Sequence, residues 1–147
     1  MRFKVRTVAS PEQALRALTD FSERRPEIWR RSLDPKKYEL RELGPTWAVA
    51  RESSPGSPFW VTARYDWSDA AVVRWTVVQS SYGGGGGGTI RITPDGSGGS
   101  RLDVEWANTD PRPLQRPLLL VLHRGPMGRL IAAMWASALD QYAARDS

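Results

Sequence analysis

The sequence predicts an α+β fold in which a curved antiparallel sheet of six to seven strands wraps around one long C-terminal helix. From Pro126 to Asp146 the apolar residues recur at about 100° per residue, which is the period of an amphipathic helix. Most of the chain before it alternates apolar and polar residues with a period of two, as strands with one buried face do. Short segments of Gly, Pro, Asp and Ser separate these strands, so we expect neighbouring strands to pair antiparallel.

The apolar face of the C-terminal helix is unusual in content. It combines methionine and aromatic residues with smaller ones: Met127, Ile131, Met134, Trp135, Ala138 and Tyr142, with Leu130 and Leu139 at its edges. Methionine adapts to irregular gaps, and tryptophan and tyrosine carry a polar tip on a large apolar ring. The face is therefore either an ordinary core face or the lining of an adaptable cavity.

The first forty residues predict one strand followed by two short helices. Apolar and basic residues alternate from Phe3 to Thr7, which is typical of a strand with one inward face. Ser10 can cap a helix that has Pro11 at its first position, and Gln13 can complete a capping box. A second short helix is expected around residues 27–32.

The middle of the chain predicts the remaining strands, around residues 38–42, 47–51, 59–67, 72–79, 89–93 and 101–106. In the phase that we assign to them, Trp47, Arg51 and Gln79 point inward together with the other strand aromatics. The carboxylates Asp66, Asp69, Asp103 and Glu105 fall in the polar phase or in turns, so we expect them to face solvent.

The glycine run from Gly83 to Gly88 is the most conspicuous local feature. A phosphate-binding loop needs such glycines before a helix, usually followed by Lys and Ser or Thr. Here the strand expected from Thr89 follows, and no lysine does. We therefore expect a floppy hairpin loop, or alternatively a mobile rim over the mouth of a cavity.

The order of strand, two short helices, meander and long C-terminal helix resembles the START-like superfamily, also called SRPBCC or Bet v 1-like, with its helix-grip fold. Asp20-Phe21, Pro26 and Trp29 are similar to a family segment in which an aromatic residue usually stands where this chain has Arg25. Further similarities to bacterial polyketide cyclase/dehydrase-like members are Ser10-Pro11-Glu12, Val73-Arg74-Trp75 and Gly99-Ser100-Arg101-Leu102. The resemblance implies a single START-like domain over residues 1–147. The superfamily includes lipid carriers, hormone receptors, aromatic cyclases and chaperone cofactors.

Composition excludes several classes of site and partner. The chain has no cysteine, so it has neither a disulfide framework nor a thiol nucleophile, which fits a cytoplasmic protein. One histidine without cysteine excludes the usual zinc sites, and we expect no metal and no cofactor. The net charge is +5, but the arginines are scattered, which argues against nucleic-acid binding. We find no signal peptide, and the apolar run from Leu118 to Leu122 is too short to span a membrane.

The aromatic residues are the strongest indication of a binding site. Seven tryptophans in 147 residues are many for a compact core, and large flat rings suit the wall of a pocket for a flat apolar ligand. The predicted ligand-binding residues are Trp29, Trp47, Tyr65, Trp67, Trp75, Gln79, Trp106, Met134, Trp135 and Ala138. Plain filling of the core is the alternative. Arg51 and His123 are weak candidates for a catalytic role.

Three hypotheses about function follow. In the first, the protein binds a small hydrophobic molecule, of aromatic or polyketide type, in a cavity between the sheet and the C-terminal helix. In the second, the same fold is a cofactor-independent cyclase or dehydratase. In the third, the core is filled and the protein is an interaction module. A monomer and a homodimer are both compatible with the sequence.

Overall fold

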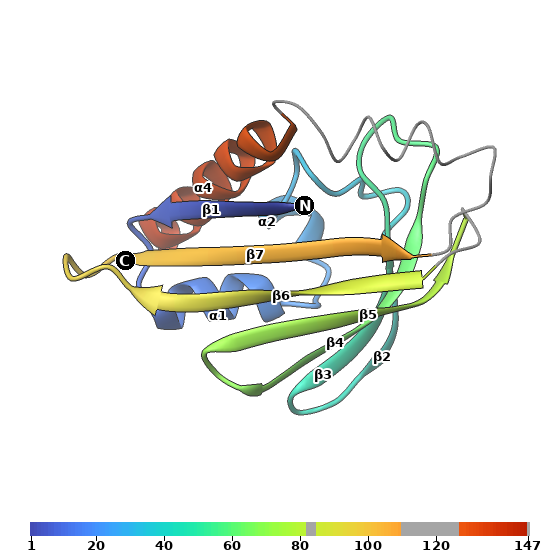
Figure 1. Ribbon diagram of the computed structural model, residues 1–147, viewed down its shortest axis with the longest axis horizontal. Helices are drawn as coiled ribbons and strands as arrows, with labels where there is room; N and C mark the ends of the chain where they lie inside the picture. The colour runs from blue at the N-terminus through green and yellow to red at the C-terminus, as the bar shows by residue number, and fades with distance from the viewer. Residues whose placement is uncertain (82–84, 110–126, 147) are drawn as a thin grey trace.

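The computed structural model describes residues 1–81, 85–109 and 127–146. In these ranges seven strands form one antiparallel sheet in the order β1-β7-β6-β5-β4-β3-β2. Figure 1 shows that the sheet curves, with the long helix α4 lying beside β1. The elements are β1 (Arg2–Thr7), α1 (Pro11–Thr19), α2 (Arg25–Ile28), β2 (Glu39–Leu43), β3 (Trp47–Glu52), β4 (Val61–Asp69), β5 (Val72–Ser80), β6 (Gly85–Pro94), β7 (Ser100–Thr109) and α4 (Met127–Asp146). The predicted fold class is confirmed.

Both short helices follow β1, as expected. At the start of α1 the backbone N–H of Gln13 donates to Ser10 Oγ at 3.2 Å, and the N–H of Ser10 donates to Gln13 Oε1 at 2.9 Å. This is the predicted capping box. The second helix is earlier and shorter than residues 27–32. It ends at Ile28 because the backbone of Trp29 is not helical (φ −108°, ψ 35°). The carbonyl of Trp29 then accepts the N–H groups of Ser32 and Leu33 in a following turn.

Helix α4 is fixed to the N-terminal elements by polar contacts. Asp140 Oδ1 accepts hydrogen bonds from Thr7 Oγ1 at 2.6 Å and from the N–H of Val8 at 2.9 Å. The centre of its buried face differs from the prediction: Leu139 is fully buried, whereas Leu130 is 55% exposed. The reason is that α4 packs against both β1 and α1, so the residues between these two contacts become the most buried.

The predicted phase of β3 is wrong. Ala48 and Ala50 are fully buried and pack with Phe21, whereas Trp47 and Arg51 lie on the outer face of the sheet. The space between β3 and Phe21 accepts only a small side chain, so the bulky residues of this strand point outward. There the Trp47 ring covers Gly44 and lies 5.2 Å from the guanidinium carbon of Arg64.

The predicted inward position of Gln79 is also wrong, because β5 contains a bulge. Thr62 pairs with Gln79 but Ala63 pairs with Val77, so Val78 is an extra residue in the strand. One extra residue exchanges the two faces of a strand. Val77, before the bulge, points inward like Trp75, and Gln79, after it, is exposed on the outer face.

The glycine run is only partly a hairpin connection. Gly85 to Gly88 belong to β6 and pair with β7, while Gly83 and Gly84 lie outside the described residues. A Cβ atom on Gly88 would lie 2.5 Å from the Trp75 ring and would also meet the carbonyl oxygen of Glu105. The absence of a side chain at Gly88 therefore lets the Trp75 indole lie directly against the sheet.

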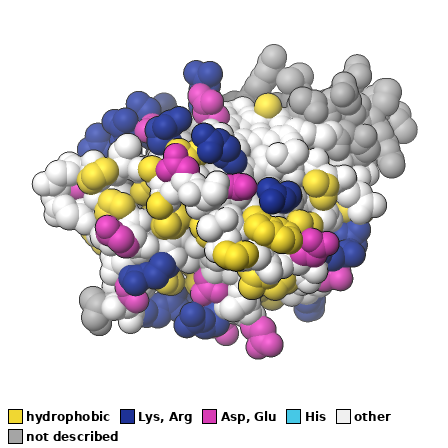
Figure 2. Space-filling view, turned by 90° about the horizontal axis from the view of Figure 1, so that it is seen from below, with side chains coloured by type: hydrophobic (Ala, Val, Ile, Leu, Met, Phe, Trp, Pro, Cys, Tyr) yellow, Lys and Arg dark blue, Asp and Glu magenta, His cyan; other side chains and the backbone are white. Residues whose placement is uncertain are grey.

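The molecular surface carries charges of both signs. In the view of Figure 2, the Lys and Arg side chains are interspersed with Asp and Glu and with small apolar areas. Within the described ranges, none of the helices has the length and apolarity needed to cross a membrane.

Candidate ligand-binding site

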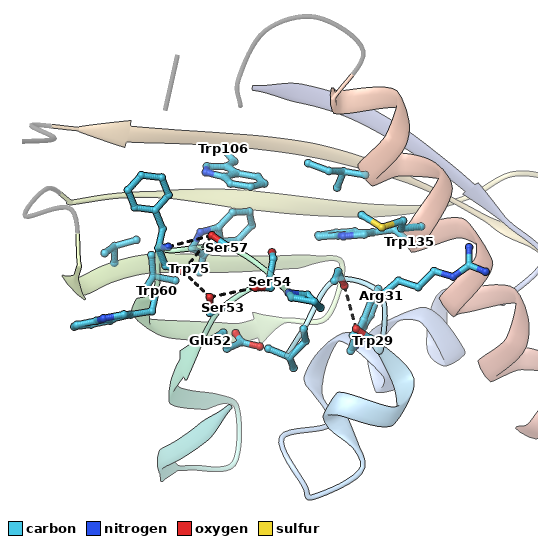
Figure 3. A pocket seen from close by; sticks show the side chains of 18 of the residues that line it. Trp29, Arg31, Glu52, Ser53, Ser54, Ser57, Trp60, Trp75, Trp106 and Trp135 are labelled. Atoms are coloured by element: carbon cyan, nitrogen blue, oxygen red, sulfur yellow. Dashed lines mark hydrogen bonds between the residues drawn. The ribbon is translucent and has the colours of Figure 1, made fainter. Parts of the chain in front are cut away.

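A cavity of about 600 Å³ lies between the sheet and α4. Figure 3 shows indole rings around it that come from different elements: Trp75 and Trp106 from the sheet, Trp135 from α4, and Trp29 from the end of α2. The loop from Ser53 to Trp60 forms another part of its wall. The lining therefore includes several aromatic rings and is assembled from segments distant in sequence.

Contacts within the protein hold several of these rings in place. Trp29 Nε1 donates to the carbonyl oxygen of Ala17 at 3.1 Å. The ring of Trp135 lies edge-on to Trp29, with centroids 5.5 Å apart, and edge-on to Phe3 at 5.4 Å. Edge-to-face packing restricts the orientation of each ring. These walls are thus largely preformed.

The loop beside β3 is tied back to the rest of the protein. Ser53 is 6% exposed, and its hydroxyl donates to the carbonyl oxygen of Phe59 at 2.5 Å. The N–H of Asp34 donates to the carbonyl oxygen of Ser53 at 2.8 Å. The N–H of Trp60 donates to Ser81 Oγ at 2.9 Å. These bonds make the loop a defined wall of the cavity.

One side of the cavity is polar and consists of Arg25, Glu52 and Tyr65, which we call the polar cluster. Arg25 Nε donates to Glu52 Oε2 at 2.9 Å, and the Tyr65 hydroxyl donates to Glu52 Oε1. Arg25 Nη1 also donates to the carbonyl oxygen of Leu18 at 2.8 Å. The guanidinium carbon lies 4.0 Å from the centre of the Phe21 ring, a cation–π geometry. A charged pair is thereby held among apolar walls.

Burial and charge shift the titration of this cluster. Burial raises the pKa of Tyr65 well above its usual value, and the nearby Glu52 carboxylate raises it further. For Arg25, burial lowers the pKa, but the Glu52 carboxylate outweighs that effect, so the pKa is raised overall. Burial also raises the pKa of the neighbouring Tyr38 to about 12. At neutral pH Arg25 is therefore charged and Tyr65 keeps its proton.

Six of the ten residues predicted to bind a ligand line this cavity: Trp29, Tyr65, Trp75, Trp106, Met134 and Trp135. Trp47 and Gln79 do not, because they lie on the outer face of the sheet. Trp67 points inward but stacks on Phe21, with centroids 5.7 Å apart, and does not line the cavity. Ala138 lines a separate hollow of about 100 Å³ next to Ile28.

The two candidate catalytic residues are not placed in the cavity by the described structure. The guanidinium carbon of Arg51 lies 3.6 Å from the centre of the Trp60 ring, and Arg51 does not line the cavity. His123 lies outside the described residues. In the ranges 1–81, 85–109 and 127–146, no three His, Asp or Glu side chains gather where they could hold a metal ion.

Arg25 and Glu52 are site residues that were not predicted from the sequence. Two indications of them were present. Arg25 occupies the position where the resembling family usually has an aromatic residue, next to Pro26. Glu52 has the same strand phase as Ala48 and Ala50, so it would have been found if these small residues had been assigned to the buried face.

A family model described as polyketide cyclase / dehydrase and lipid transport matches residues 2–144. The chain belongs to this family. No curated protein matches the chain. The predicted kinship with START-like, polyketide cyclase-type proteins is thus confirmed, and the family description covers both lipid transport and cyclase or dehydrase chemistry.

Solved structures with low sequence identity share the fold. A crystal structure of a protein from Thermus thermophilus has a TM-score of 0.77 at 17% identity and covers 100% of this chain and 98% of its own. The Zhui aromatase/cyclase from Streptomyces sp. R1128 has a TM-score of 0.69 at 18% identity, covering 100% and 94%. A START superfamily protein from Mycobacterium smegmatis has a TM-score of 0.71 at 15% identity, covering 100% and 98%. At these identities the likeness concerns the fold.

Proposed function

We propose that this protein binds a small, flat and largely apolar molecule in the cavity between the sheet and α4. The observation that supports this function best is the cavity of about 600 Å³ with walls of indole rings. Small-molecule pockets typically have volumes of roughly 300–1,000 Å³ and a mainly apolar lining with a few polar groups. The cavity matches that description, and a protein whose interior is filled for structural reasons would not need it.

The aromatic walls indicate what kind of molecule fits. Trp75 and Trp106 from the sheet and Trp135 from α4 present large rings to the cavity. Flat ligands gain contact area and favourable ring–ring geometry against such surfaces. Because several rings are held by the protein itself, little conformational freedom is lost on binding, which favours affinity.

A pair of tryptophan substitutions on one strand tests the binding site. Val77 lines the cavity, and its neighbour Val78 is 58% exposed on the outer face. Val77→Trp should fill part of the cavity, whereas Val78→Trp adds the same side chain outside. Binding is measured with N-phenyl-1-naphthylamine, a neutral probe whose emission rises in apolar surroundings. The melting temperature of each variant verifies that it is folded.

We expect one probe molecule to bind per wild-type chain. Val78→Trp should bind it with similar affinity, and Val77→Trp should bind it at least about tenfold more weakly. Equal affinity of both variants would place the probe outside the cavity and would contradict the proposal. Native mass spectrometry of protein purified from its own host would identify the natural ligand.

A second candidate function is a cofactor-independent cyclization or dehydration, as the family description also allows. The observation that favours it is the Glu52 carboxylate, which reaches the cavity beside a protonated Tyr65. A carboxylate in this position can act as a general base that accepts a proton from a carbon next to a carbonyl group. Incubation with a reactive polyketone chain tests this. A product ratio that the protein changes, and that Glu52→Gln restores to the spontaneous value, supports catalysis; unchanged products exclude it.

A further inference from the structure

The polar cluster of Arg25, Glu52 and Tyr65 contains the groups of the cavity wall best placed to distinguish ligands by charge. All three side chains line the cavity. The side chains of Arg25 and Glu52 are 8% and 13% exposed. A ligand group that reaches them is therefore shielded from bulk water. In such surroundings hydrogen bonds and charges discriminate more strongly than they do in water.

The hydrogen-bonding capacity of Arg25 is mostly used within the protein. Its Nε donates to Glu52 Oε2 at 2.9 Å, and its Nη1 donates to the carbonyl oxygens of Leu18 at 2.8 Å and Asp20 at 3.4 Å. One face of the guanidinium packs on the Phe21 ring. A carboxylate binds a guanidinium in bidentate fashion through two adjacent nitrogens, either Nε with Nη2 or Nη1 with Nη2. In Arg25 each of these pairs includes a nitrogen that already donates within the protein, so neither pair is fully available.

Glu52, by contrast, retains the capacity to accept hydrogen bonds. A carboxylate has about four lone-pair positions, and the protein donates one hydrogen bond to each of its two oxygens, from Arg25 and from Tyr65. The Tyr65 hydroxyl already donates its only hydrogen in a hydrogen bond to Glu52, so its oxygen can only accept. On the side of Glu52 and Tyr65, a ligand therefore meets hydrogen-bond acceptors. A hydroxyl group can donate to them, and a carboxylate cannot.

The charges of the cluster lead to the same conclusion. Arg25 and Glu52 compensate each other, so a neutral ligand leaves no buried charge unpaired. An anion at this wall would lose its hydration and lie next to the Glu52 carboxylate. Two further positive groups occur at the lining, but neither belongs to the polar cluster. Arg31 is exposed, so solvent screens its charge, and the amino group of Met1 already donates to the carbonyl oxygen of Trp106 at 2.6 Å.

We propose that the polar cluster selects neutral aromatic ligands whose hydroxyl group donates a hydrogen bond to Glu52, over carboxylates of the same size. This inference rests on the proposed function, since it requires a ligand in the cavity. It adds the chemical class of that ligand: a neutral aromatic alcohol or phenol. The hydroxyl would lie at the polar cluster and the rings between the indoles.

Three probes with the same ring system test the selectivity: naphthalene, 2-naphthol and 2-naphthoate. At neutral pH the first two are uncharged and the third is an anion. Their affinities for the full wild-type chain are measured by calorimetry or by quenching of tryptophan emission. We expect 2-naphthol to bind at least about tenfold more tightly than naphthalene, because it adds a hydrogen bond to a charged group. We expect 2-naphthoate to bind more weakly than 2-naphthol by a similar factor.

Glu52→Gln tests the role of the carboxylate, and Glu105→Gln is its matched control. Glu105 also pairs with an arginine, Arg2, at 3.1 Å, but its side chain is 57% exposed on the outside of the sheet. In Glu52→Gln the charge of Arg25 is uncompensated, so the preference should reverse in favour of 2-naphthoate. Glu105→Gln should keep the wild-type order. Arg31→Gln should also keep the wild-type order of affinities. A loss of 2-naphthoate affinity in that variant would show that the anion binds near exposed Arg31 and not at the polar cluster.

The outcomes separate this inference from the proposed function. If none of the three probes binds, the proposed function fails. If all three bind with equal affinity, or if 2-naphthoate binds best to the wild type, the cavity binds ligands but the selectivity is refuted. A wild-type order that persists in Glu52→Gln refutes the role of Glu52. If Glu52→Gln does not fold, the wild-type series with its three probes still decides the selectivity.

Discussion

Arg25 Nε lies 2.9 Å from Glu52 Oε2, and this ion pair joins the segment after α1 to the end of β3 beside the cavity. Other ion pairs of the described residues, such as Arg2–Glu105, lie largely in solvent. Burial makes the difference. A buried charge that loses its partner is destabilising, whereas solvent replaces a lost partner at the surface. The pair is therefore both a structural link and a determinant of the cavity's polarity.

Loss of the buried charge should reduce stability far more than loss of an exposed one. We expect Glu52→Gln to lower the free energy of unfolding by about 3 kcal/mol, since Arg25 stays buried without a counter-charge. Glu105→Gln should lower it by less than about 1 kcal/mol. Urea unfolding followed by tryptophan emission measures both values. Equal losses in the two variants would mean that the buried pair contributes no more than a surface pair.

A side chain at Gly88 should disrupt the packing of Trp75. A Cβ atom there would lie 2.5 Å from the indole and would also meet the backbone oxygen of Glu105, which cannot rotate away. We expect Gly88→Ala to lower the free energy of unfolding by about 1–3 kcal/mol. Gly128→Ala is the control, because its Cβ would have only an ordinary contact, 3.9 Å from Phe3.

The control should change stability in the opposite direction. Alanine favours a helix over glycine by up to about 1 kcal/mol, so Gly128→Ala in α4 should leave the melting temperature unchanged or raise it. Calorimetry measures both variants. If Gly88→Ala were as stable as the wild type, the Trp75 ring and the neighbouring backbone could move away from the new methyl group without a cost in stability.

Stability should fall at alkaline pH because two partly buried tyrosines resist ionisation in the folded protein. Burial raises the pKa of Tyr65 well above its usual value and raises that of Tyr38 to about 12. Between about pH 10 and 12 the unfolded chain loses these protons while the folded protein keeps them, so the free energy of unfolding decreases as pH rises. Below about pH 10 both states are protonated, and this contribution is constant.

Ultraviolet absorbance of phenolate measures this difference. Native protein near pH 11 should lack the absorbance of Tyr38 and Tyr65, which should appear after unfolding in guanidinium. Tyr65→Phe should weaken the pH dependence of the unfolding free energy in this range. Identical titrations of the native and unfolded protein would refute the predicted burial of these hydroxyl groups.

Local patterns in the sequence were sufficient for most helices and strands and for the antiparallel pairing of successive strands, but not for the pairing of β1 with β7. The capping residues Ser10 and Gln13 begin α1 as predicted, and the helical period from Met127 onward forms α4. Turn residues between alternating segments specified antiparallel neighbours, which the sheet order confirms. These features depend on residues close together in the chain, so they can be recognised without knowledge of tertiary contacts.

The composition of the cavity depended on contacts between distant segments. Phe21 leaves room only for Ala48 and Ala50 on β3, and this turns Trp47 and Arg51 outward. The extra residue at Val78 likewise exchanged the two faces at the end of β5. A period of two gives the alternation of a strand but not which phase is buried, because small residues are buried wherever a neighbouring element approaches closely.

By itself, the sequence determined that a curved sheet packs with a C-terminal helix and that aromatic residues are abundant on the inward strand faces. Only the tertiary structure decided which aromatic rings surround the cavity, and that Arg25 and Glu52, 27 residues apart, meet there. The physical reason is that secondary structure follows from local periodicity, whereas a buried ion pair requires two distant segments to be brought within hydrogen-bond distance and removed from water together.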